Sequence, residues 1–120
     1  MKTFEDKAND LIGRPYEAYE ANCWSLVMEL VPDAPNVQES ADNLAKSVRT
    51  FKKEVELHNA EEVKILYNKD IVLMGRDNEV FFHAGVYYEG GVIHASLNGV
   101  VYEPIDSIRR QYNSVKGFRV

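Results

Sequence analysis

The hydrophobic pattern of the chain changes once, near Val63, and this change constrains the fold more than any other feature. Before it, apolar residues recur at helical spacing over residues 3–13, 22–31 and 37–57. After it come short apolar runs separated by turn motifs: "VKILY", "DIVLM", "EVFFHAGVYY", "GVIHAS", "GVVYEPI" and "GFRV". A short helix is expected over 105–112, between the last two strands. Helices followed by an antiparallel sheet predict an α+β fold, with the helices packed on one face of the sheet.

Length and charge narrow the functional classes. The chain has 120 residues, which predicts one domain spanning 1–120. The formal net charge of -5 argues against a nucleic-acid partner. No apolar run approaches the roughly 20 residues of a membrane span, so no membrane insertion is expected. The opening "MKTFEDKAND" lacks the apolar core of a signal peptide, which indicates synthesis in a cytoplasm without an export signal.

The chain contains one cysteine, Cys23, in "ANCWSLVMEL". Asn22 is a good helix N-cap residue, which places Cys23 in the first turn of a helix. Unpaired N–H groups and the helix dipole would stabilise a thiolate there and lower the pKa of the thiol. The alternative is a buried cysteine that fills space, as free cysteines commonly do.

Two histidines could supply a base for this cysteine. His83 and His94 lie on neighbouring strand candidates joined by "YYEGGV", whereas His58 is predicted to be a surface residue. If the "EG" dipeptide forms the turn, Gly85 faces His94, and the two imidazoles become diagonal neighbours about 7–8 Å apart at Cβ. If "GG" forms the turn, they are too far apart for a hydrogen bond. Both turns are chemically reasonable, and the catalytic interpretation requires the first.

Other interpretations of these side chains remain open. Each histidine alone could be a half-buried strand residue. A zinc site built from the cysteine and both histidines lacks any short ligand pair, so no metal is expected. The following aromatic residues could line a substrate groove or pack in the core, and core packing is favoured for Trp24: Tyr16, Tyr19, Trp24, Tyr87 and Tyr88.

The motifs "GRPY", "NCWSLV" and "HAGVYYEGGVIHAS" occur in an order that resembles the NlpC-type cell-wall cysteine peptidases, which have a compact papain-like fold. The resemblance covers roughly residues 10–120. Within this family, the sequence most resembles the bacteriophage tail-associated branch, where a tryptophan commonly follows the cysteine.

The resemblance implies roles for individual residues. Cys23 would be the nucleophile, His83 the general base, and His94 the residue that orients His83. Tyr16, Asn22 and Trp24 would shape the oxyanion and substrate sites. Such enzymes cleave amide bonds in peptidoglycan stem peptides, typically between D-γ-glutamyl and a diamino acid, without a metal or organic cofactor.

This sequence departs from the family pattern at four places. Asn22 replaces a common aspartate, Ser25 a common glycine, and Lys69 the glycine of a Gly-Asp pair; the loop "EAYEA" is short. The departures concern substrate identity more than the chemistry.

The resemblance also implies a location and partners. We expect a phage tail-tip protein, carried in the virion, that acts on peptidoglycan stem peptides and contacts other tail proteins. The alternatives are a structural tail-tip or assembly protein with little activity, and a thiol amidase or acyltransferase with a non-wall substrate. A cytosolic peptide-recycling enzyme would equally lack an export signal.

Overall fold

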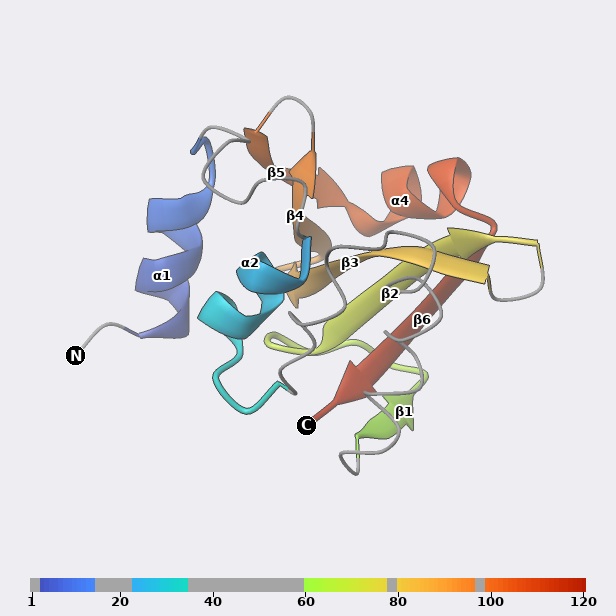
Figure 1. Cartoon of the computed structure of the whole chain (residues 1–120), viewed down its shortest axis with the longest axis horizontal. Helices are drawn as coiled ribbons and strands as arrows, with labels where there is room; N and C mark the ends of the chain where they lie inside the picture. The colour runs from blue at the N-terminus through green and yellow to red at the C-terminus, as the bar shows by residue number, and fades with distance from the viewer. Residues whose placement is uncertain (1–2, 15–22, 35–59, 78–79, 97–98) are drawn as a thin grey trace.

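The computed structural model describes residues 3–14, 23–34, 60–77, 80–96 and 99–120 (Figure 1). The fold combines helices with an antiparallel sheet, as the hydrophobic pattern predicts. The helices are α1 (Phe4–Leu11), α2 (Cys23–Leu30) and α4 (Ile105–Gln111). The strands are β1 (Glu61–Val63), β2 (Ile71–Arg76), β3 (Val80–Tyr88), β4 (Gly91–Ser96), β5 (Gly99–Pro104) and β6 (Ser114–Arg119). The helix predicted over 37–57 lies outside the described residues. No helix within the described ranges has the length and apolar character needed to cross a membrane.

Helix α1 begins where its sequence predicts. The hydroxyl of Thr3 accepts a hydrogen bond from the backbone N–H of Asp6, and the Asp6 carboxylate accepts one from the Thr3 N–H. This reciprocal capping box satisfies two N–H groups that the helix leaves unpaired. Phe4, Ala8 and Leu11 are buried, so the predicted apolar face is the packed one.

The sheet has six strands in the order β1-β6-β2-β3-β4-β5, and all neighbours are antiparallel. Strand β6 is last in sequence but lies between β1 and β2. The run "VKILY" is not a full strand: β1 ends at Val63, and the side chains of Ile65 and Tyr67 are 68% and 60% exposed. Ile65 and Tyr67 are therefore apolar residues on the surface, and they do not belong to a buried strand.

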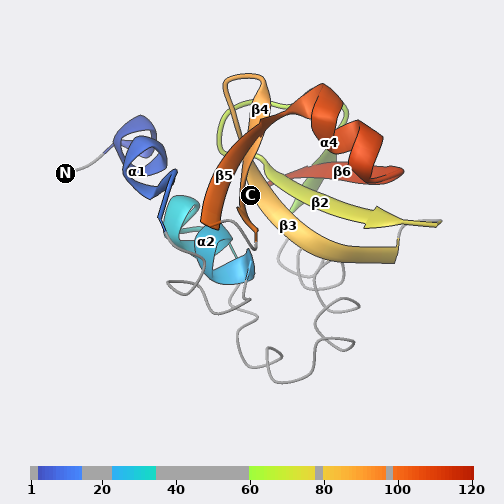
Figure 2. The ribbon, with the colours of Figure 1, turned by 90° about the horizontal axis from the view of Figure 1, so that it is seen from above.

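Two apolar clusters lie on opposite faces of the sheet. The larger cluster joins α1 and α2 to residues such as Leu73, Ala84 and Ile93. The smaller joins Val72, Met74, Val92 and Ile108, and it seats α4 on the other face (Figure 2). The expectation that helices occupy one face is therefore correct for α1 and α2 and wrong for α4. The physical reason is that β2 alternates buried residues on both faces, so each face needs a cover.

The hairpin between β3 and β4 has the register that the catalytic interpretation requires. Tyr88 pairs with Gly91, which leaves Glu89 and Gly90 as the two-residue turn. Their φ angles are 44° and 84°, as a type I′ turn demands. Asn68 compensates for the non-glycine residue, because its amide exchanges two 2.8 Å hydrogen bonds with the Glu89 backbone N–H and carboxylate.

A buried carboxylate ties the start of β2 to the end of β6. Asp70 is 2% exposed and accepts hydrogen bonds from Arg119 Nε at 2.9 Å and Nη2 at 2.8 Å. The preceding residue, Lys69, has φ 80°, a conformation that glycine adopts without strain. Backbone geometry therefore favours glycine at this position, although the chain carries a lysine there.

Candidate functional site

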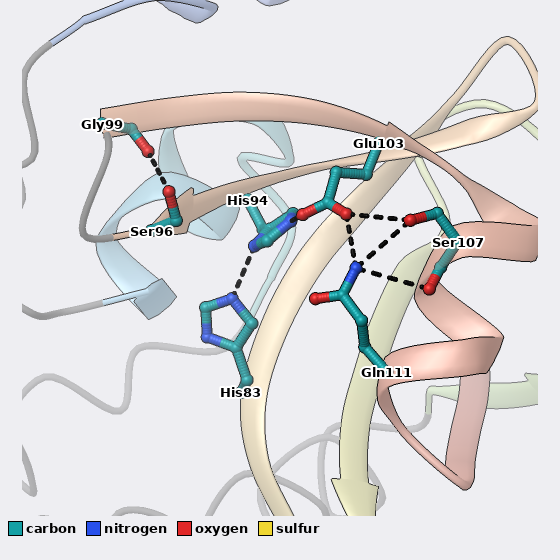
Figure 3. A network of polar contacts seen from close by, with 7 residues as sticks. All are labelled: His83, His94, Ser96, Gly99, Glu103, Ser107 and Gln111. Atoms are coloured by element: carbon teal, nitrogen blue, oxygen red, sulfur yellow. Dashed lines mark hydrogen bonds and ion pairs between the residues drawn. The ribbon is translucent and has the colours of Figure 1, made fainter.

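Two histidines meet on the face of the sheet that α4 covers. Nε2 of His83, from β3, lies 2.8 Å from Nδ1 of His94, from β4 (Figure 3). The ring centroids are 4.9 Å apart, and the rings are nearly perpendicular at 82°. His94 is buried, with 3% of its surface exposed. The predicted approach of the two imidazoles is therefore confirmed.

Gly85 makes this approach possible. A Cβ atom at Gly85 would lie 2.6 Å from the Ile93 carbonyl oxygen and 3.0 Å from Cβ of His94. Any side chain at this position would push β3 and β4 apart, directly beside the histidine pair. The space that the sequence predicts opposite His94 is thus required by the packing.

The structure adds a carboxylate that the sequence analysis did not identify. Nε2 of His94 lies 2.9 Å from Oε1 of Glu103 on β5. The other carboxylate oxygen accepts hydrogen bonds from Gln111 Nε2 at 2.6 Å and Ser107 Oγ at 3.2 Å, both on α4. We call His83, His94 and Glu103 the relay. Glu103 could have been found from strand alternation, had the register of β4 with β5 been known.

Burial controls the protonation of the relay histidines. Desolvation first, and the neighbouring His94 second, lower the pKa of His83 to about 3, although Glu103 opposes the change. Desolvation also lowers the pKa of His94 and outweighs its hydrogen bond to Glu103. Both imidazoles are therefore uncharged near neutral pH.

The carboxylate at the other end of the relay stays ionised. Desolvation acts to raise the pKa of Glu103, but hydrogen bonds from Gln111, His94 and Ser107 together hold it below its ordinary value. The relay thus consists of two neutral rings ending on one negative charge.

Aromatic side chains lie near His83. The Tyr112 ring is nearly parallel to the His83 imidazole, at 22° and 6.2 Å between centroids. Phe82 lies 5.7 Å from Tyr112 and is 40% exposed. An exposed phenyl ring near the histidine pair is a surface on which a ligand could pack.

Helix α2 begins at Cys23 and contacts both β3 and β4, the strands that carry the histidines. It packs on the sheet face that carries Ala84, whereas His83 is paired with Met74 on the opposite face. The Cys23 side chain lies outside the described part of the structure.

The remaining predicted residues fall into two groups. Tyr16, Tyr19 and Asn22 lie outside the described residues. Trp24 is 1% exposed and belongs to the core cluster, as the packing interpretation favours.

Tyr87 and Tyr88 do not line one groove together. Tyr88 packs against the cluster under α1 and α2, and Tyr87 packs against the cluster under α4. The reason is strand alternation, which directs successive side chains to opposite faces.

The relay is not arranged around a metal. Among the described side chains, no group of three or more histidine, cysteine, aspartate and glutamate residues could hold an ion. His94 contacts its two neighbours through opposite ring nitrogens, so the three groups form a line and do not converge on one point.

Comparison of the chain with protein-family models, with curated proteins and with solved structures gives no match. The functional argument therefore depends on the geometry of the site and on the sequence motifs.

Proposed function

We propose that the chain is a papain-like cysteine peptidase of the NlpC type, with Cys23 as nucleophile, His83 as general base and His94 as the residue that orients it. The observation that carries the proposal is the 2.8 Å contact between His83 and His94. It occurs in the hairpin register that the cysteine peptidase motif requires, on strands packed against the helix that begins at Cys23.

The chemistry would proceed in two steps. His83 accepts the thiol proton as sulfur attacks the carbonyl carbon, and the resulting imidazolium gives that proton to the leaving amine as the C–N bond breaks. Water then attacks the thioester, His83 takes its proton, and the thiol leaves with the proton returned. The Cys23 N–H, at a helix start, would help to stabilise the oxyanion, with Tyr16 nearby.

The proposed substrate class is the one that the resemblance to the NlpC-type peptidases implies. We assign the activity to amide bonds of peptidoglycan stem peptides, of the D-γ-glutamyl–diamino acid type, and the protein to a phage tail tip that contacts other tail proteins. Asn22 would contact the stem peptide where relatives carry aspartate. Because Trp24 is 1% exposed, we assign it to anchoring α2 in the core, not to substrate contact.

The proposal is tested by hydrolysis of purified peptidoglycan and of synthetic stem peptides. Cys23→Ala and His83→Ala should each lower kcat/KM by roughly 10³-fold or more. His58→Ala is the matched control and should leave the rate unchanged. Hydrolysis that survives Cys23→Ala would refute the peptidase. A thioester trapped from the substrate and identified by mass spectrometry would separate wall cleavage from a thiol amidase or acyltransferase with another substrate.

A structural tail-tip role with little activity is the second candidate. The pKa of His83, lowered to about 3, favours it, because such a weakly basic imidazole accepts a thiol proton poorly. A phage carrying Cys23→Ser that assembles and infects normally would support the structural role. Intact particles that fail to infect would exclude it.

A further inference from the structure

We propose that Glu103 is a positioning residue that fixes the proton on each histidine of the relay, so that Nδ1 of His83 is the nitrogen free to accept a proton. This inference rests on the proposed role of His83 as the general base. It follows from donor and acceptor identities along the relay (Figure 3).

The carboxylate of Glu103 fixes the proton position on His94. An ionised carboxylate can only accept hydrogen bonds. Because Glu103 Oε1 lies 2.9 Å from Nε2 of His94, that nitrogen must carry the hydrogen. A neutral imidazole has one N–H, so Nδ1 of His94 is an acceptor.

The proton position on His94 in turn fixes the proton position on His83. Nδ1 of His94, as an acceptor, requires a donor from Nε2 of His83 at 2.8 Å. Nδ1 of His83 is then unprotonated, and it hydrogen-bonds to none of the described residues. The nitrogen left bare is the one on the far side of the ring from the relay.

Hydrogen bonds from α4 hold the carboxylate of Glu103 in place. Oε2 of Glu103 accepts hydrogen bonds from Gln111 Nε2 at 2.6 Å and Ser107 Oγ at 3.2 Å. These donors, four residues apart on α4, occupy one oxygen and leave the other for His94. Ile108, on the same helix, is fully buried and fixes α4 against the sheet.

The relay needs no proton to travel along it. When His83 accepts a proton at Nδ1, its Nε2–H stays on His83 and its hydrogen bond to His94 strengthens. Glu103 then stabilises the new positive charge through His94 while remaining a carboxylate.

The test reads proton positions directly, by long-range ¹H–¹⁵N NMR of the full chain with labelled histidine. We expect both His83 and His94 to be protonated at Nε2 and bare at Nδ1. In Glu103→Gln, the donors on α4 hold the amide oxygen, so the amide NH₂ faces His94. Both rings should then switch to Nδ1–H, and kcat should fall by up to roughly 10⁴-fold, as for a catalytic histidine held in the wrong tautomer.

A swapped pair separates this role from simple packing. In Glu103→Gln/Gln111→Glu, the carboxylate on α4 accepts from the new amide NH₂, and the amide oxygen turns back to His94. The double variant should restore Nε2–H on both rings and recover most of kcat. Glu62→Gln removes an exposed carboxylate that pairs with Lys116 at 3.1 Å, and it should change neither readout.

The inference is overturned if either ring of the wild-type protein carries its proton on Nδ1, if Glu103→Gln leaves both rings unchanged, or if the swap does not restore them. The NMR readout does not depend on hydrolysis. Tautomers that switch as expected in a protein that cleaves no peptide would refute the peptidase and leave the proton placement intact. An active enzyme whose rings do not switch would refute only the role of Glu103.

Discussion

Gly85→Ala should be among the most damaging small substitutions in the sheet. The new Cβ would lie 2.6 Å from the Ile93 carbonyl oxygen and 2.6 Å from Cγ1 of Val92. A rotamer change can move the valine methyl but not the backbone oxygen, so β3 and β4 must separate. Overpacking of this kind costs about 1–3 kcal/mol, and the backbone contact puts this site at the upper end.

Thermal and urea unfolding give the measurement. For a chain of 120 residues, unfolding entropies of about 2.1 cal/mol/K per residue convert each kcal/mol into about 4 °C. We therefore expect the Tm to fall by about 8–12 °C. NMR should also show weakening of the His83–His94 hydrogen bond, because the separation occurs directly beside it.

Gly90→Ala is the control for losing a glycine. Gly90 has φ 84°, and nothing lies within 4 Å of its added Cβ, so the variant suffers backbone strain of roughly 1–2 kcal/mol without a clash. The packing argument is refuted if Gly85→Ala is no more destabilising than Gly90→Ala.

Three further predictions concern stability. Because the pKa of His83 is lowered to about 3, the unfolded chain binds protons first as the pH falls below about 6.5. Unfolding in urea should therefore show stability that is complete above this pH and declines toward pH 3, by up to about 1.4 kcal/mol per pH unit from His83, and the lowered pKa of His94 adds to the decline. A flat profile would contradict this prediction. Ile108→Ala should cost about 2–5 kcal/mol in thermal unfolding, because Ile108 is fully buried between α4 and the sheet, whereas Ile108→Val should cost about 1 kcal/mol; equal losses would count against the packing of α4. Lys69→Gly should raise the free energy of unfolding, measured by urea denaturation, by about 0.5 kcal/mol. Glycine relieves the strain of a φ of 80°, and the greater flexibility of the unfolded chain offsets part of that gain. Lys69→Ala should give no such gain.

Local signals in the sequence predicted the hairpin but left its register open. The Glu-Gly-Gly turn permitted two registers, and the structure adopts the one that places His83 and His94 on one face. Side-chain alternation with period two carries the register along both strands, so the histidine contact follows from the sequence once the turn is known.

Contacts between segments that are far apart in the sequence could not be predicted from local signals. Glu103 reaches His94 because β5 pairs with β4 and because α4 then folds back across the same face. The sequence has no local pattern that joins Gln111 to a histidine on β4. The insertion of β6 between β1 and β2 could not be predicted for the same reason, since it pairs residues 39 to 58 positions apart.

By itself, the sequence determined the order of the described helices and strands, and it limited the turn that joins β3 to β4 to two registers, one of which brings the two histidines together. Each depends on periodicity or turn chemistry within a few residues. Only the tertiary structure decided that α4 covers the opposite face from α1 and α2, and that a carboxylate completes the relay. The physical reason is that both require surfaces far apart in the chain to be buried together, and the free energy of that burial is a property of the packed sheet, not of any one segment.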